Sequence, residues 1–294
     1  MMQMLNRGTG LLVIEVRCSN PNGDPDAESE PRTLESGTRG LISPVSFKRK
    51  LRDLVADKDG PVWQMAASVL HLPHNGDARQ YLILEARGRD RKKISEMDPE
   101  PFRREFWDGR VFGNTFLEAM EGERKGDHFI NTGVVQFGAG LSISPIEIER
   151  LTTTNKAGVQ EGKDRGMAPL GWRVVRHAVY VMPFFVNPMA AGKTGCDCLD
   201  IDLLKFLIPH AYRNTASAIR PFVEIRHAWY AEHKNPLGSC PDSLILDALA
   251  PRKMKGDPEE ASQSIDEYKI PTELPELVRV RLASCDDLCA KTWD

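Results

Sequence analysis

The chain alternates short apolar runs with polar loops, and the first apolar run predicts a β-strand. Its apolar residues are Leu11, Leu12, Val13, Ile14 and Val16. Gly8 and Gly10 precede the run, and a cluster of Asn, Pro and Gly residues follows it. Because apolar, β-branched runs bounded by turn formers are typical of strands, we predict a strand over residues 10–17.

A helix is predicted over residues 44–57. Ser43 is a suitable N-cap, and Pro44 stands in the first turn, where a missing N–H costs nothing. The apolar residues with helical spacing are Phe47, Leu51, Leu54 and Val55. At 3.6 residues per turn, Lys48, Arg49 and Arg52 share an adjacent arc. One face can pack on a core while its neighbour presents three cations, although ordinary solvated charges remain the alternative.

The rest of the pattern predicts a mixed fold. The further helices are expected at residues 61–71, 99–106 and 200–217, and the further strands at 80–86, near 132–138 and 142–150, at 172–186 and at 221–231. Strands and helices interleave without a regular βαβ repeat, so we predict an α+β fold with an antiparallel sheet. No internal repeat or low-complexity segment is evident.

The loop after the first strand is built from turn formers and contains two prolines, which predicts a fixed shape. Its oxygen-bearing residues alternate as in a calcium loop: Asn20, Asn22, Asp24 and Asp26. Such a loop needs Gly at its sixth position and an acid at its twelfth, and here these positions hold Pro25 and Pro31. An EF-hand is therefore not expected. A polar loop leading into a basic helix suits the binding of a phosphate chain.

Composition indicates a folded protein of the cell interior. The 294 residues suggest one or two domains, and 41% hydrophobic content supports a substantial core. No apolar run approaches a membrane span, and the N-terminus lacks a signal-peptide pattern, so we expect a cytoplasmic protein without membrane contact. The pairs Cys196/Cys198 and Cys285/Cys289 lack the spacing of a zinc knuckle. We expect reduced thiols, no metal and no cofactor.

The net charge of −3 is unevenly distributed. Residues 257–294 carry 10 acidic and 4 basic side chains, which leaves 32 acidic and 35 basic side chains in residues 1–256. The body is thus mildly basic and the C-terminal segment acidic. Local basic clusters decide phosphate binding more than the total does.

A long polar, glycine-rich segment at residues 151–171 separates two runs of alternating apolar and polar residues. A loop of this length within a compact domain is usually functional or disordered. His177 lies in the following run without a nucleophile motif beside it, so a structural role is expected. Trp107, Phe112 and Phe116 could stack on bases, but their context favours core packing.

Several segments together resemble a known family. They are Asn20-Pro-Asn-Gly-Asp-Pro-Asp26, Pro31-Arg32, Gly40-Leu41, Phe47-Lys-Arg-Lys-Leu-Arg52, Trp107-Asp-Gly-Arg-Val-Phe-Gly113, Asn131-Thr-Gly-Val-Val-Gln136, Ser142-Ile-Ser-Pro-Ile-Glu-Ile148, Arg176-His-Ala-Val-Tyr-Val181, Lys193-Thr-Gly195 and Lys234-Asn-Pro-Leu-Gly-Ser-Cys-Pro241. Their order resembles the "Cas-seven" backbone subunit of type I CRISPR Cascade complexes, within the RAMP superfamily, and is most similar to the type I-C form. The resemblance covers roughly residues 8–250, while residues 58–105 depart from the type I-C pattern.

The resemblance implies an RRM-like (ferredoxin-like) palm over residues 1–294. It also implies a helical finger insertion at 58–130, a long β-hairpin thumb at 137–180 and an acidic C-terminal segment at 251–294. The implied function is non-catalytic binding of the guide RNA (crRNA), along which copies polymerise and which they present for pairing with the target DNA strand. The implied partners are the crRNA, the target DNA strand, neighbouring copies and other Cascade subunits.

The residues expected to contact RNA follow from the loop, the basic helix and the resemblance. They are Asn20, Asn22, Lys48, Arg49, Arg52, Lys156, Met167, Leu170, Arg173, Arg176, Arg213 and Arg220. Among them, Met167 and Leu170 lie near the end of the polar segment and suit an apolar wedge that breaks base stacking.

Two other functions stay open at the level of sequence. Type III relatives of the superfamily cut target RNA with a metal ion and a backbone-subunit aspartate in the loop after the first strand. Asp24 and Asp26 lie in that loop, so a metal-dependent ribonuclease is the alternative. The third is a globular protein without a nucleic-acid role.

Overall fold

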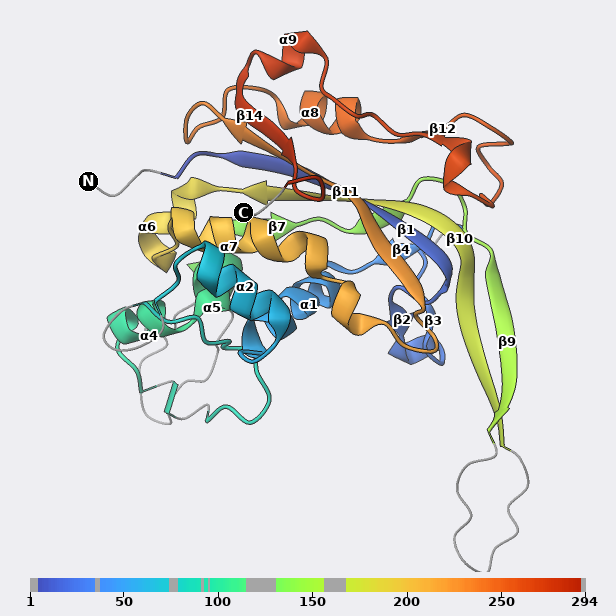
Figure 1. Ribbon diagram of the computed structural model, residues 1–294, viewed down its shortest axis with the longest axis horizontal. Coiled ribbons are helices and arrows are strands. Elements are labelled where there is room, and N and C mark those ends of the chain that lie inside the picture. The colour runs from blue at the N-terminus through green and yellow to red at the C-terminus, as the bar shows by residue number, and fades with distance from the viewer. Residues whose placement is uncertain are drawn as a thin grey trace, which may run out of the picture.

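The computed structural model describes residues 5–34, 38–73, 79–90, 93–94, 96–114, 131–155 and 168–291. Within them, one antiparallel sheet organises the molecule (Figure 1), with the strand order β14-β11-β1-β10-β8-β4 and with β7 and β9 also paired to β10. These strands are β1 (Gly8–Ser19), β4 (Leu41–Ile42), β7 (Val135–Phe137), β8 (Gly140–Ser142), β9 (Ile148–Asn155), β10 (Ala168–Val186), β11 (Phe222–His233) and β14 (Leu282–Asp287). The predicted α+β class with an antiparallel sheet is confirmed.

β1 is the central strand, and it is buried on both faces. Leu12, Ile14 and Val16 pack into the main core, whereas Leu11 and Val13 belong to smaller clusters on the opposite face. A strand covered on both sides needs no polar face, which explains why the run reads as continuous rather than alternating. The three long strands predicted from the sequence are confirmed. β1 extends beyond both predicted limits, β10 begins four residues earlier than predicted, and β11 begins one residue later and ends two residues later.

Helices cover one face of the sheet (Figure 1). They are α1 (Pro44–Ala56), α2 (Pro61–Val69), α4 (Pro99–Glu105), α5 (Trp107–Phe112), α6 (Ala191–Thr194) and α7 (Cys198–Leu207). On the other side lie α8 (Asp242–Leu249), α9 (Glu276–Arg279) and the small sheet of β12 (Arg252–Lys253) and β13 (Tyr268–Lys269). Along the chain the main elements follow in the order β1-α1-β7-β8-β10-α7-β11. In the sheet, β1 lies between β10 and β11.

Two predicted elements differ from the structure. The expected helix at 200–217 ends at Leu207 and continues as the 3₁₀ turns Ile208–His210 and Arg213–Thr215. Pro209 explains the end, since proline removes a helical hydrogen bond and clashes with the preceding turn. The expected strand at 80–86 is wrong. There the backbone N–H groups of Leu84 and Glu85 donate to the Asp108 carboxylate instead of a neighbouring strand.

The two strands predicted near 132–138 and 142–150 are present as four shorter pieces. β6 (Asn131–Thr132) pairs with β5 (Gly113–Asn114), while β7, β8 and β9 each pair with β10. β9 and β10 form a hairpin that extends away from the sheet (Figure 1), with Ile148 opposite Val175 and Asn155 opposite Ala168. No helix within the described ranges is long and apolar enough to cross a membrane.

Candidate nucleic-acid interface

The loop after β1 has a defined, hydrogen-bonded shape. β2 (Gly23–Asp24) and β3 (Glu30–Pro31) pair across the 3₁₀ turn Pro25–Ala27. The turn is closed by a hydrogen bond of 2.8 Å from the Ser29 N–H to the Asp24 carbonyl oxygen. Glu28 and Ser29 follow with φ angles of 51° and 62°, the left-handed conformation that reverses the chain.

Asn20 and Asn22 fix this loop to the rest of the protein. The Asn20 amide donates to the Ser29 carbonyl oxygen at 2.7 Å and to that of Arg173 at 3.3 Å, and the residue is only 1% exposed. The Asn22 Oδ1 atom accepts a hydrogen bond of 2.8 Å from the Ser43 N–H, immediately before α1. Asn20 is therefore buried and shapes the loop, and its direct contact with RNA stays a prediction. Asn22 is partly accessible, and its contact with RNA stays a prediction.

Asp24 and Asp26 have contacts typical of a turn. The Asp24 carboxylate accepts the Asp26 N–H at 3.2 Å and lies 3.3 Å from the Arg32 guanidinium. No group of three or more His, Cys, Asp or Glu side chains able to hold a metal ion occurs among the described residues. A metal-dependent role of Asp24 or Asp26 stays a prediction.

α1 begins as predicted. The Ser43 Oγ atom accepts the Ser46 N–H at 3.2 Å, and Pro44 stands at the first helical position. The apolar stripe at Phe47, Leu51, Leu54 and Val55 is buried. The arc of three cations beside it, however, divides into three different environments.

Arg52 is not an accessible cation. Its guanidinium donates to the Asp108 carboxylate at 2.9 Å and lies 3.0 Å from the Glu85 carboxylate, with only 5% of the side chain exposed. The predicted phosphate contact of Arg52 therefore does not fit this structure, because a paired, buried guanidinium would have to leave two carboxylates. Asp108 was not recognised as its partner because the two residues are 56 positions apart in the sequence.

Arg49 is exposed and makes a helical ion pair with Asp53 at 2.8 Å. Its guanidinium also donates to the Glu85 carbonyl oxygen at 3.1 Å. Such exposed pairs contribute little stability and exchange readily with other partners. Arg49 therefore remains available to an anionic ligand, and its contact with RNA stays a prediction.

Lys48 borders a pocket beside α1. The pocket has a volume of about 340 Å³, and its lining includes Lys48, Phe112, Gly133 and Gln136. The Lys48 ammonium lies 5.3 Å from the Phe112 ring and makes no ion pair within the described part of the chain. Burial, together with the nearby Arg52 charge, lowers the pKa of Lys48. A cation in a partly desolvated pocket is a strong binder of an anion that enters it.

The predicted arginines of β10 are paired with acidic residues. Arg173 lies 3.4 Å from Glu28 and 3.6 Å from Glu30, so it links β10 to the loop after β1. Arg176 lies 3.4 Å from Glu147 at the base of the hairpin. Neither guanidinium is free in this structure. RNA contacts by Arg173 and Arg176 would require these exposed pairs to exchange.

A second basic region adjoins the loop from the side of β11. The Arg220 Nε–H donates to the Asn20 carbonyl oxygen at 2.9 Å, and the Asn20 N–H donates to the Ile219 carbonyl oxygen at 2.8 Å. Arg213 is exposed on the preceding 3₁₀ turn. Lys50, which sequence reasoning did not select, extends from α1 to within 5.2 Å of the Tyr212 ring, next to Arg213 in the sequence. Burial, together with the charge of Arg220, lowers the pKa of Lys50.

The structure does not describe the side chains of three residues that were predicted to contact RNA. Lys156 and Met167 lie outside the described residues. The backbone of Leu170 pairs with that of Thr153 in the β9–β10 hairpin, but its side chain is not among those that the structure describes. Their contacts with RNA stay predictions.

His177 is structural, as predicted. It is 2% exposed, with its ring nitrogens 2.8 Å from the Ser262 Oγ atom and 3.4 Å from the Glu15 carboxylate. Trp107 and Phe112 are buried in the core, which confirms the packing role expected of them. Phe116 lies outside the described residues. The six cysteines are free thiols.

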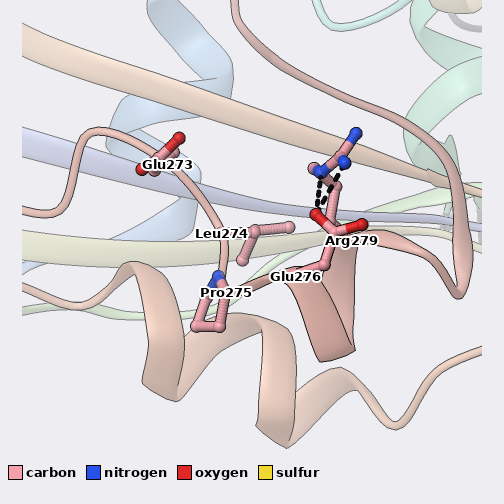
Figure 2. A pocket seen from close by; sticks show the side chains of 5 residues that line it. All are labelled: Glu273, Leu274, Pro275, Glu276 and Arg279. Atoms are coloured by element: carbon pink, nitrogen blue, oxygen red, sulfur yellow. Dashed lines mark hydrogen bonds and ion pairs between the residues drawn. The ribbon is translucent and has the colours of Figure 1, made fainter.

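Another pocket lies on the far side of the sheet, at α9 (Figure 2). It has a volume of about 610 Å³ and is lined by Glu273, Leu274, Pro275, Glu276 and Arg279. Its single cation, Arg279, pairs with Glu276 at 2.6 Å. The pocket is therefore acidic overall and unsuited to a phosphate chain.

Comparison with known proteins gives a consistent set of relatives. Residues 6–273 match the family model described as "CRISPR-associated protein Cas7". A "CRISPR-associated protein Cas7" from Haloferax volcanii is 25% identical over 235 residues, which cover 74% of this chain and 67% of that protein.

Solved structures with a partial likeness include two described as RNA-guided CRISPR complexes. A chain of "CRISPR RNA-guided surveillance complex, pre-nicking" has a TM-score of 0.45 and 13% identity, over 76% of this chain and 78% of that chain. A chain of "CRISPR RNA-guided surveillance complex" has a TM-score of 0.43 and 15% identity, over 76% and 68%. A chain of the "Type III-B Cmr-beta bound to cognate target RNA" has a TM-score of 0.40 and 10% identity, over 77% and 61%.

Proposed function

Because the chain belongs to the Cas7 family of CRISPR-associated proteins, we propose that it is the guide-RNA-binding backbone subunit of a type I Cascade surveillance complex. In this role it has no catalytic residues. Copies assemble along the guide RNA with other Cascade subunits and present the guide for pairing with the target DNA strand. Sequence recognition rests on base pairing, while the protein holds the RNA through its backbone.

The observation that carries this proposal is the Lys48 ammonium in a pocket beside α1, which makes no ion pair with any described residue, on a helix whose start is joined to the fixed polar loop by Asn22. Asn22 joins that loop to the start of α1, so the loop and the lysine keep a constant relation. A guide held by its phosphates needs such a rigid, sequence-independent contact. Arg49 on the same helix adds a second, exchangeable cation.

The finer architecture belongs to the same proposal. The order β11-β1-β10-β8, with α1 and α7 on one face, supports an RRM-like (ferredoxin-like) palm. We assign residues 58–130 to the finger insertion, residues 137–180 to the thumb and residues 251–294 to the acidic C-terminal segment. The β9–β10 hairpin that leaves the sheet supports the thumb assignment.

The alternative is a metal-dependent ribonuclease that uses Asp24 or Asp26. Asp24 is engaged by Arg32 and by the Asp26 N–H, so a metal ion would have to displace a cation already in place. This contact disfavours the alternative. Incubation of the guide-loaded assembly with complementary RNA and Mg²⁺ separates the two functions, because periodic cuts lost in Asp24→Ala would overturn the non-catalytic assignment.

RNA binding is tested with a matched pair of variants. Lys48→Met removes the proposed phosphate contact, whereas Lys269→Met makes the same charge change at an exposed position of β13, on the other side of the sheet. Fluorescence anisotropy over a range of salt concentrations measures the affinity of single-stranded RNA. Lys48→Met should weaken binding equally across sequences and reduce the log–log salt slope by about 0.7. Equal slopes in the two variants would contradict the proposed role of Lys48.

A further inference from the structure

A further pocket lies on the face of the sheet that is turned away from α1, between β11 and the segment 255–270 that contains β13. Its volume is about 520 Å³, within the usual range of about 300–1,000 Å³ for small-molecule sites. The lining combines basic, acidic and apolar side chains, which include Arg226, His227, Lys255, Asp266, Ile265 and Ile270. This mixture differs from the acidic pocket at α9.

An irregularity in β11 brings two adjacent basic residues to this pocket. Val13 of β1 pairs with His227, and Ile14 pairs with Ile225, so Arg226 is an extra residue without a partner in β1. Successive side chains of a regular strand point to opposite faces, whereas a β-bulge redirects the side chain at the extra position. Arg226 and His227 therefore both line the pocket. Bulges of this kind are over-represented next to functional sites.

A carboxylate holds His227 in one orientation. The His227 Nδ1 atom lies 2.8 Å from the Asp287 Oδ2 atom, and the ring stacks on Trp229 with centroids 5.6 Å apart. The other Asp287 oxygen accepts the N–H groups of Ala228 and Cys289, at 2.9 and 3.1 Å. Because an ionised carboxylate only accepts hydrogen bonds, Nδ1 carries the proton and Nε2 is left for a ligand. Nε2 has no hydrogen-bond partner among the described residues, and 26% of the side chain is exposed.

The two other cations of the pocket also have donors that a ligand can use. Arg226 lies 3.3 Å from the Glu224 carboxylate and 3.6 Å from that of Glu15, and both contacts involve its Nη1 atom. These contacts position the guanidinium, while its Nε and Nη2 groups have no partner within the described part of the chain. Lys255 is exposed, and its ammonium makes no ion pair or hydrogen bond with a described residue.

A nucleoside monophosphate matches this mixed lining. Its phosphate oxygens can accept hydrogen bonds from the three basic groups, and arginine and lysine are common phosphate ligands. Its ribose hydroxyls can donate to Asp266, as they do to carboxylates in other nucleotide sites. The Asp266 carboxylate accepts one hydrogen bond from the described residues, from the Ser264 hydroxyl at 3.3 Å. The base can pack on Ile265 and Ile270. An acidic ligand without such hydroxyls would be repelled by Asp266, and an apolar one would leave the basic groups unpaired.

We propose that this pocket binds a free nucleoside monophosphate, with the phosphate at Arg226, His227 and Lys255 and the ribose at Asp266. The site lies on the opposite face of the sheet from α1, and it does not depend on the proposed contact with guide RNA. The ligand contacts both β11 and the segment 255–270, so it connects the main sheet to the small sheet of β12 and β13. Binding therefore stabilises the folded protein in proportion to ligand concentration.

Two exposed lysines provide a test of the phosphate contact. Lys255→Met removes a cation of the lining, whereas Lys269→Met makes the same change on β13, outside the lining. Isothermal titration calorimetry with the full chain measures the affinity for AMP, GMP, CMP and UMP. Lys255→Met should raise the dissociation constant by about tenfold, as expected for the loss of a charge-assisted hydrogen bond, and Lys269→Met should leave it unchanged. Absence of saturable binding by the wild type, or equal affinities of the two variants, would overturn the proposal.

Altered ligands test the remaining contacts. The wild type should prefer the tightest-binding nucleotide to its 2′,3′-dideoxy form, and Asp266→Ala should lose that preference because the acceptor of the ribose hydroxyls is gone. The same preference in wild type and variant would show that the ribose does not contact Asp266. Inorganic phosphate that binds as tightly as the nucleotides would show that base and ribose contribute nothing. A single-stranded oligonucleotide that binds where mononucleotides do not would place the pocket on the path of a nucleic-acid strand. Each of these three results contradicts the assignment of a free nucleoside monophosphate.

Discussion

The buried Arg52–Asp108 pair predicts a large loss of stability when either partner is removed. Asp108 is 1% exposed, and its carboxylate accepts the Arg52 Nε–H at 2.9 Å and the backbone N–H groups of Leu84 and Glu85 at 2.7 and 3.2 Å. Breaking a buried ion pair leaves an uncompensated charge and typically costs about 3–5 kcal/mol. Arg52 also contacts Glu85, which is 57% exposed, so Arg52→Met should lie near the lower end of that range.

Arg49 provides the matched control on the same helix. Its pair with Asp53 has side chains 49% and 50% exposed, and such i,i+4 pairs contribute about 0.3–0.5 kcal/mol. Equilibrium urea unfolding of wild type, Arg49→Met and Arg52→Met measures both free energies. The double variant Arg52→Met/Asp108→Asn should cost less than the sum of its single changes, since the two side chains interact directly. Equal costs for Arg49→Met and Arg52→Met would refute the assignment of Arg52 to the core.

Three further outcomes are expected. Ser43→Ala should cost about 1 kcal/mol in urea unfolding, because it removes the cap on the Ser46 N–H; an unchanged midpoint would contradict the cap. Gly10→Ala should destabilise by about 1–3 kcal/mol, since its Cβ would clash with the Phe184 ring, whereas Gly192→Ala meets nothing within 4 Å and should not destabilise. The pKa of Lys50 is lowered from 10.5 to about 8, so the unfolded chain binds more protons between these values; wild-type stability should therefore rise with pH from about 8 toward 10.5 relative to Lys50→Met, and parallel pH curves would contradict this.

Elements with a strong local signal could be predicted from the sequence. The cap at Ser43 and Pro44 and the apolar stripe of α1 were sufficient to locate that helix, because both depend on residues within two turns of each other. The expected strand at 80–86 failed for the opposite reason. The backbone N–H groups of Leu84 and Glu85 bind the side chain of Asp108, more than 20 positions away, and no local pattern reports such a contact.

The candidate site was predictable as a region but not in its individual contacts. The residue types predicted a polar loop after β1 that leads into a basic helix. In the structure, Asn22 of that loop directly contacts the start of α1. The same reasoning treated Lys48, Arg49 and Arg52 as equivalent cations and omitted Lys50. These four cations of α1 differ in the residues that surround them. Those residues come from α5, the 213–220 turn and the chain near Glu85, which are distant from α1 in the sequence.

The environment of each charge on α1 therefore indicates its role better than its position on the helix does. The buried Arg52 guanidinium is paired with the carboxylates of Glu85 and Asp108, so its charge is already neutralised within the fold. Arg49 has one exposed partner, so its charge can exchange at little cost. Lys48 and Lys50 are desolvated and have no ion-pair partner among the described residues, so each retains a charge that an anion can satisfy.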